Sequence, residues 1–387
     1  MNEPFNHNSL CNLIHMKWPF LLLLVSTLNV FGAGPSETGR LTLPFDAHWL
    51  FLKANATNAD KVFFDDASWR KLNVPHDWSI EGPFSPTNPA GGAGAFLPSG
   101  VVWYRKHFTL PVTDSNRCAF IEFDGVMANS DVWINGFHLG HRPNGYVSFS
   151  YELTGHLNVG GDNVLAVRCD TSEQPASRWY AGAGIYRHVR FVETSPLHFD
   201  RDGIFVSTPA VSPAQATIKI ETTLTNEFAA NLKFTLQTRV IGPDGKPVAS
   251  AETDGTIMAN DSEGYSRQIV LANPQLWDLD APELYSAVSK IVSDGKCLDE
   301  QTSTFGIRDA HFEAATGFWL NGKNFKIKGV CLHADGGAFG AAVPLSIWQA
   351  RLEALKSLGV NAIRTAHNPQ LPAFYDLCDR LGILVMD

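Results

Sequence analysis

Residues 361–387 read N-A-I-R-T-A-H-N-P-Q-L-P-A-F-Y-D-L-C-D-R-L-G-I-L-V-M-D. The apolar run at 360–363 predicts a strand, and the apolar spacing over 372–381 predicts a helix that ends at Gly382. Residues 383–386 are apolar again and predict a second buried strand. The stretch therefore predicts a βαβ unit.

Three polar residues lie at the predicted strand ends, namely Arg364, His367 and Asp387. If the unit belongs to a barrel of parallel strands, side chains at the C-terminal ends of the strands face the active site. Arg364 and His367 are therefore candidate site residues. Each also has an ordinary structural interpretation, as a strand-end cation and as a hydrogen-bonding residue at the start of a helix.

The same alternation precedes this stretch. Residues 326–333 predict a buried strand, and residues 347–358 predict an amphipathic helix followed by Gly359. Strands that alternate with helices are typical of a parallel sheet covered by helices, either a barrel or an open doubly wound sheet. No G-x-G-x-x-G motif follows any strand, which argues against nucleotide binding.

The chain before this region is rich in β-strand patterns. Residues 39–196 alternate short apolar runs with Gly, Asn and Pro turns, including a predicted tight hairpin at Asn135-Gly136, and their size favours an eight-stranded jelly roll. Residues 197–308 repeat the pattern with about seven strands, which favours an immunoglobulin-like sandwich. Residues 309–387 hold the strand and helix alternation.

Length and charge limit the classes of partner. The 387 residues have room for two or three domains. The formal net charge is −9 and the 30 Lys and Arg residues are scattered, which excludes nucleic acid and an anionic membrane surface as expected partners. A neutral ligand fits better.

Residues 1–34 are predicted to be a signal peptide. An apolar run at 19–31 follows Lys17 and precedes the small residues at 32–34. The run is too short for a comfortable bilayer span of about 20 residues, and no later apolar segment approaches that length. The mature protein is therefore expected to be soluble, and either periplasmic or secreted.

The six cysteines show no C-x-x-C spacing, so neither a zinc site nor a disulfide framework is indicated. Cys11 would leave with the signal peptide. If one pair of the remaining cysteines forms a disulfide, Cys118 and Cys169 are the favoured pair because both lie in the first β module.

The chain resembles glycoside hydrolase family 2, and most closely its exported bacterial β-galactosidases. In residues 361–387 only Asn368 departs from the family pattern, which commonly has Tyr there. The residues that fall at the family's spacing are Asn361, Arg364, Thr365, Ala366, His367, Pro369, Phe374, Tyr375, Asp379 and Gly382. Three more segments carry the resemblance: V-P-H-D-W at 74–78, S-R-W-Y-A-G-A-G-I-Y-R at 177–187, and K-G-V-C-L-H-A-D-G-G-A-F-G-A-A-V-P at 328–344.

The resemblance implies a jelly roll, an immunoglobulin-like sandwich and the start of a (β/α)8 barrel that stops after about three strands. It also implies a sugar-binding shell. The implied substrate-binding residues are His333, Asp335, Arg364, His367, Arg178 and Trp179. A lesser expectation concerns His76, Asp77 and Trp78, which either brace a strand end or contact sugar.

By the same resemblance, the full enzyme hydrolyses terminal β-galactosides with retention, using two carboxylic acids about 5 to 5.5 Å apart. The family carries both on later barrel strands, so neither catalytic glutamate is expected in this chain, which should be an inactive fragment. No metal or cofactor is expected in it, although the resemblance allows a divalent cation in the full enzyme, and a homo-oligomer. The alternatives are a β-glucuronidase or β-mannosidase, a noncatalytic carbohydrate-binding protein, and a truncated reading frame.

Overall fold

A computed structural model describes residues 39–110 and 116–387. The predicted signal peptide at 1–34 lies outside the described residues. None of the helices that the structure describes is both long enough and apolar enough to cross a bilayer.

The first module is a sandwich of two antiparallel sheets. One has the strand order β1-β10-β5-β8, and the other has the order β3-β2-β4-β9-β6-β7. The strands are β1 (Leu41–Pro44), β2 (Trp49–Leu52), β3 (Arg70–Leu72), β4 (Val101–Thr109), β5 (Cys118–Phe123), β6 (Ser130–Ile134), β7 (Phe137–Arg142), β8 (Phe149–Glu152), β9 (Asp162–Asp170) and β10 (Val189–Thr194). The described residues of this module also form three 3-10 helices, namely η1 (Trp78–Glu81), η2 (Gly92–Gly94) and η4 (Thr154–His156).

The described part of this module thus has ten strands, whereas the sequence predicted eight. Strands as short as β3, with three residues, show no readable alternation, so periodicity undercounts them. The hairpin predicted at Asn135-Gly136 is confirmed, because it joins β6 to β7 and both residues have positive φ, 51° and 83°.

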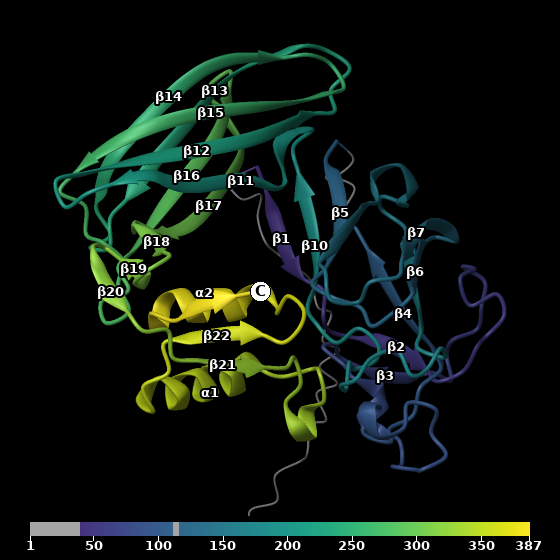
Figure 1. The fold of residues 1–387 in the computed structure, drawn as a ribbon. Helices are drawn as coiled ribbons and strands as arrows, with labels where there is room; N and C mark the ends of the chain where they lie inside the picture. The colour runs from purple at the N-terminus through teal and green to yellow at the C-terminus, as the bar shows by residue number, and fades with distance from the viewer. Residues whose placement is uncertain (1–38, 111–115) are drawn as a thin grey trace, which may run out of the picture. The chain divides into compact units, whose positions relative to one another are not determined.

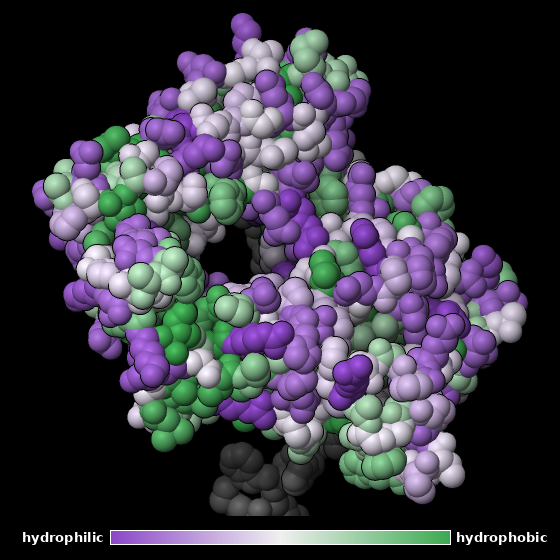
Figure 2. All heavy atoms as spheres, in the orientation of Figure 1, coloured by the Kyte–Doolittle hydropathy of each residue, from purple (hydrophilic) through white to green (hydrophobic). Residues whose placement is uncertain are grey.

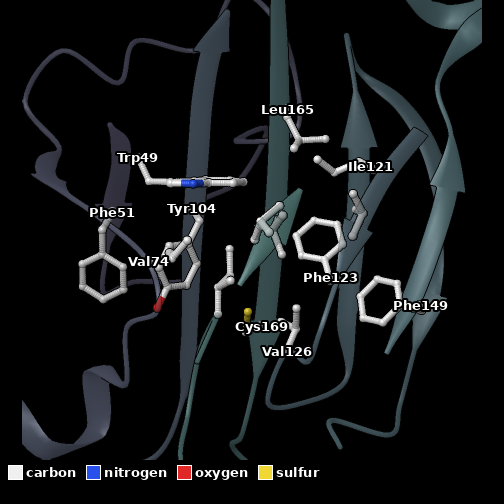
Figure 3. Packing of buried hydrophobic residues seen from close by; sticks show 14 of the residues in the cluster. Trp49, Phe51, Val74, Tyr104, Ile121, Phe123, Val126, Phe149, Leu165 and Cys169 are labelled. Atoms are coloured by element: carbon white, nitrogen blue, oxygen red, sulfur yellow. The ribbon is translucent and has the colours of Figure 1, made fainter. Parts of the chain in front are cut away.

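The core of the sandwich lies between its two sheets. Figure 3 shows Trp49, Tyr104, Phe123 and Phe149 pointing into it from different strands, with the Cys169 sulfur among them. Burying a large apolar side chain stabilises a fold by roughly 1.5–3 kcal/mol, so this layer holds the sheets together. Cys169 is therefore a core residue, and the alternative of a bridge to Cys118 is wrong because both cysteines are free.

The second module is a smaller sandwich, with one sheet in the order β11-β12-β15 and the other in the order β14-β13-β16-β17. Along β12, buried and half-buried residues alternate strictly, as expected for a strand with one face on the core. The strands are β11 (Leu197–Val211), β12 (Gln215–Asn226), β13 (Leu232–Ile241), β14 (Pro247–Ile257), β15 (Asp261–Ala272), β16 (Leu284–Ser293) and β17 (Lys296–Gly306).

A small antiparallel sheet, β18 (Ala310–Glu313), β19 (Gly317–Leu320) and β20 (Lys323–Phe325), precedes the strand and helix alternation. The last part of the described chain is a parallel sheet in the order β21-β22-β23 with two helices packed on it (Figure 1). Its elements are β21 (Gly329–Leu332), the 3-10 helix η5 (Gly337–Phe339), α1 (Leu345–Ser357), β22 (Ala362–Thr365), α2 (Pro372–Leu381) and β23 (Leu384–Met386).

Helix α2 has the predicted bounds, and the positive φ of Gly382 ends it. Helix α1 starts two residues earlier than predicted, because the Pro344 carbonyl accepts from the Trp348 N–H and opens the helix. Strand β22 starts at Ala362 rather than at Val360, whose N–H donates to the Leu355 carbonyl at the end of α1.

Strand β21 is also shorter than predicted, because the Asn361 side chain hydrogen-bonds the backbone before it, accepting from Lys328 N and donating to Lys326 O. Figure 2 shows hydrophobic residues gathered on the visible face over this parallel sheet and its helices. Among the exposed apolar residues here are Leu358, Val385 and Met386.

Candidate functional site

Four of the predicted site residues form one cluster. His333 follows β21, Arg364 lies in β22, and His367 lies two residues beyond the end of β22. The ring centroid of Trp179, from the first sandwich, is 4.9 Å from that of His367 and 6.0 Å from that of His333. The two imidazoles are 5.5 Å apart and nearly perpendicular. The cluster therefore combines aromatic faces with polar nitrogens, at the C-terminal ends of the parallel strands.

Arg364 orients His367. Its Nη1 lies 2.9 Å from His367 Nδ1. A guanidinium only donates hydrogen bonds, so His367 Nδ1 must accept, and in the neutral imidazole the proton is then on Nε2. His367 can therefore donate from Nε2 to an oxygen of a ligand.

His333 has a nitrogen without a partner. Its Nδ1 is buried and has no hydrogen-bond partner among residues 39–110 and 116–387. A buried polar atom left unpaired costs about 1–3 kcal/mol, so a hydroxyl that reached it would be favourable.

Trp179 is held from its far edge. Its Nε1 donates to the hydroxyl of Tyr146 over 3.1 Å, and Tyr146 lies in the loop between β7 and β8. Burial raises the pKa of Tyr146, so this hydroxyl stays neutral. The indole is half-buried and keeps a fixed orientation beside the two histidines.

A buried carboxylate joins the segments that carry the cluster. Asp77 is 2% exposed and accepts four hydrogen bonds. Its Oδ1 accepts from Ser79 N and Ala183 N, at 3.2 and 3.0 Å. Its Oδ2 accepts from Tyr180 Oη and Ala341 N, at 2.6 and 2.8 Å. Burial raises the pKa of Asp77, and these hydrogen bonds oppose that rise.

Asp77 therefore ties the loop that carries Trp179 to the loop that follows β21. Of the two expectations for residues 76–78, bracing describes Asp77. His76 is likewise occupied within the first sandwich, because Nδ1 lies 2.9 Å from the Tyr104 hydroxyl and Nε2 lies 3.0 Å from the Glu81 carboxylate.

A second tie is made by Arg187, which is buried. Its Nη2 donates to the Pro369 carbonyl over 2.7 Å, and its Nη1 donates to the Tyr146 carbonyl over 2.8 Å. One guanidinium thus fixes both the loop behind Trp179 and the segment just after His367. Arg187 lies inside the quoted 177–187 motif, but Tyr146 lies in no motif and sequence reasoning missed it.

Two predicted residues lie apart from these contacts. The Arg178 side chain is exposed and makes no hydrogen bond or ion pair with the described residues. Asp335 is half-buried. Its backbone carbonyl accepts a hydrogen bond from Arg351 over 3.0 Å, and its carboxylate has no hydrogen-bond or ion-pair partner among the described residues. Asp387 instead accepts from the Tyr375 hydroxyl at 2.7 and 2.8 Å and from Thr365, so it is bound to its own sheet and helix.

Within the part of the chain that the structure describes, no group of three metal-ligating side chains lies at this cluster. Its chemistry is that of hydrogen bonding and of stacking against an aromatic ring. Sugars have both hydroxyl groups and flat apolar C–H faces, and such a site suits them.

Three family models match consecutive parts of the chain. The model of a glycosyl hydrolase 2 galactose-binding domain-like module matches residues 80–199, and the model of glycosyl hydrolases family 2 matches residues 198–308. The model of the glycosyl hydrolases family 2 TIM barrel domain matches residues 314–387. The succession of jelly roll, immunoglobulin-like sandwich and barrel strands is thereby confirmed.

Similar proteins agree with this assignment. The chain is 45% identical over 343 residues to the β-galactosidase BoGH2A of Bacteroides ovatus, covering 89% of this chain and 40% of that protein. It is 39% identical to a putative β-glucuronidase of Formosa agariphila, covering 91% of this chain and 33% of that protein. A crystal structure of a glycosyl hydrolase family 2 member from Bacteroides cellulosilyticus superimposes with a TM-score of 0.87 and 37% identity, over 89% of this chain and 45% of that one. The chain thus spans less than half the length of these proteins.

Proposed function

Because the chain belongs to glycosyl hydrolases family 2, we propose that its protein hydrolyses terminal β-linked galactose with retention of configuration. The similarity to a β-galactosidase over most of the chain supports galactose as the sugar. Within this protein, the described residues supply the shell that binds and orients the sugar.

The observation that carries the proposal is the cluster of Trp179, His333 and His367. The indole offers an apolar face for the C–H side of a sugar ring. His367 Nε2 donates to one hydroxyl, and the partnerless Nδ1 of His333 can bond to another. The free carboxylate of Asp335 can accept from two hydroxyls at once.

The reaction itself requires a carboxylic acid that protonates the leaving oxygen and a carboxylate that attacks the anomeric carbon. We assign both to glutamates on barrel strands later than the three described. Arg364 would then hold the neighbouring nucleophile ionised, because a cation within about 4–6 Å lowers the pKa of a carboxyl group. The 387-residue chain is accordingly proposed to bind sugar without turning it over.

A β-glucuronidase is the second candidate, because a protein with that name is among the similar proteins. Arg364 is a cation within the cluster, and a cation is what a glucuronate carboxylate would contact. The two candidates differ in the charge of the sugar.

The test is a titration of the 387-residue chain with methyl β-galactoside and, separately, with methyl β-glucuronide. Calorimetry or ligand-observed NMR measures the affinity for each sugar. We expect binding of the galactoside, and Trp179→Ala should weaken it about threefold to tenfold, since an aromatic contact contributes about 0.5–1.5 kcal/mol. Trp319→Ala is the matched control, because Trp319 stacks on the exposed His311. Preference for the glucuronide would favour the second candidate, and equal effects of the two variants would refute the assignment of the site.

An aryl β-galactoside assay on the same preparation completes the test. No turnover is expected from the 387 residues, and robust hydrolysis would contradict the assignment of both catalytic glutamates to later strands. Sugar binding that persists in a longer protein without any hydrolysis would instead support a noncatalytic carbohydrate-binding role.

We also propose that residues 1–34 direct export to the periplasm or the medium, and that the modules divide at 39–196, 197–308 and 309–387. Strand β11, which starts at Leu197, and strand β18, which starts at Ala310, support these divisions. Sequencing the N-terminus of the mature protein tests the first point, and limited proteolysis tests the second.

A further inference from the structure

A second group of chemically reactive side chains lies outside the sugar-binding cluster. Cys118 is the first residue of β5, His198 is the second residue of β11, and Glu227 directly follows β12. One potential ligand atom from each, a sulfur, an imidazole nitrogen and a carboxylate oxygen, lies within 4.8 Å of the other two. Among residues 39–110 and 116–387, these three form the one group with such spacing.

The group is enclosed by protein. Cys118 is 3% exposed and His198 is 4% exposed, while Glu227 is half-buried. The Phe120 ring packs 5.6 Å from the imidazole of His198, centroid to centroid. Polar side chains that lie together in a buried environment usually form hydrogen bonds or bind an ion, because burying them unpaired is costly.

The thiol and the carboxylate already contact each other. Cys118 Sγ donates to Glu227 Oε2 over 2.9 Å. Burial, and then this hydrogen bond and the charge of Glu227, raise the pKa of the Cys118 thiol. A divalent cation would replace that proton, binding the thiolate and releasing the proton to solvent.

The histidine is oriented as a metal ligand would be. His198 Nδ1 lies 3.1 Å from the Ser195 carbonyl oxygen. A carbonyl only accepts, so the imidazole proton is on Nδ1 and the lone pair is on Nε2. Metal-binding histidines usually donate their other N–H to a carbonyl or a carboxylate, which fixes the tautomer and the ring orientation.

We propose that Cys118, His198 and Glu227 bind a zinc ion, with water as the fourth ligand. Thiolate, imidazole and carboxylate are the ligands that zinc takes in proteins, at about 2.0–2.3 Å in tetrahedral geometry. Ligand atoms would then lie about 3.5 Å apart, so shifts of roughly 1 Å or less per side chain close the site. Calcium and magnesium, which take oxygen ligands, do not suit this set.

The ion would have a structural role. Its ligands come from β5 of the first sandwich and from β11 and the end of β12 in the second sandwich. Binding would therefore join the two sandwiches at one point, and would stabilise the folded chain according to the zinc concentration. This site is independent of the sugar-binding cluster and of the proposed hydrolysis.

The first experiment uses the 387-residue chain, purified under reducing conditions, treated with a chelator and desalted. Zinc is then titrated, and bound metal is measured by elemental analysis together with the thermal unfolding midpoint. We expect one bound zinc per chain and a higher midpoint. Cobalt(II) in place of zinc should give a thiolate-to-cobalt charge-transfer band, which reports directly on sulfur ligation.

Variants assign the ligands. Cys118→Ser should abolish the cobalt band and weaken zinc binding by more than about tenfold. Glu227→Gln, which preserves shape, should weaken binding and retain the band, and it keeps the proposal testable if Cys118→Ser does not fold. Cys297→Ser is the matched control, because it removes a thiol outside this group, in β17 of the second sandwich, and should change nothing. Absence of the band in the wild-type chain, or equal zinc binding by wild type and Glu227→Gln, would overturn the proposal.

Discussion

Replacing Asp77 with Ala tests whether the site depends on the carboxylate that joins two modules. The substitution removes the acceptor of three backbone N–H groups, those of Ser79, Ala183 and Ala341. Each buried donor left unpaired costs about 1–3 kcal/mol. The Tyr180 hydroxyl can rotate toward another acceptor, and the cost of burying the carboxylate is recovered. We therefore take the low end and expect a loss of about 3 kcal/mol in the free energy of unfolding.

The assay is urea unfolding followed by tryptophan fluorescence, together with hydrogen exchange read by mass spectrometry. Exchange should accelerate in the loops that contain Ala183 and Ala341, and should stay unchanged in β12 and β13 of the second sandwich. Asp77→Asn keeps one acceptor oxygen, so about half the loss is expected from it. Asp202→Asn is the control, because that side chain is 84% exposed and surface changes usually stay within about 0.5 kcal/mol. A loss below about 1 kcal/mol for Asp77→Ala, or exchange unchanged at both loops, would refute the reasoning.

Two further predictions concern stability. Burial lowers the pKa of Lys106 to about 8, so between pH 8 and 10.5 the unfolded chain binds more protons than the folded chain, and stability should rise with pH in that window. Lys106→Met should remove this rise, whereas Lys246→Met, at an exposed lysine, should keep it. Unfolding midpoints measured across this pH range test the prediction. If stability rises with pH equally steeply in both variants, the assignment to Lys106 is wrong. Gly340→Ala should cost more than about 2 kcal/mol, because φ is +54° and the new Cβ would lie 2.3 Å from Asp77 Oδ2. At Gly337, where φ is +62° and no atom lies near the new Cβ, the change to Ala should cost only about 1 kcal/mol. Similar losses in the free energy of unfolding for the two variants would contradict the predicted clash between residue 340 and Asp77.

Local patterns explain which elements could be predicted from the sequence. Helix α2 begins and ends where its apolar spacing and Gly382 indicate, and the predicted Asn-Gly turn at residues 135–136 joins two strands. These features depend on residues a few positions apart, whose preferences act before any tertiary contact forms. Very short strands such as β3 carry too few residues for such a pattern and are defined by their partners instead.

Part of the candidate site could also be predicted from the sequence, because some of its residues lie close together in the chain. Arg364 and His367 lie in one motif, and the contact between them follows from their closeness in sequence. The role of Tyr146 was not readable, because a tyrosine in a turn carries no signal that it will hold the indole of Trp179.

The sequence by itself determined the succession of two sandwiches and a parallel sheet, the family, and most residues of the candidate site. Only the tertiary structure decided how distant segments meet. Asp77 reaches Ala341 across 264 positions, and the Cys118 thiol reaches Glu227 across 109. Periodicity and turn preferences act over a few residues, whereas such contacts depend on how packed layers bring strand ends together, which no local pattern encodes.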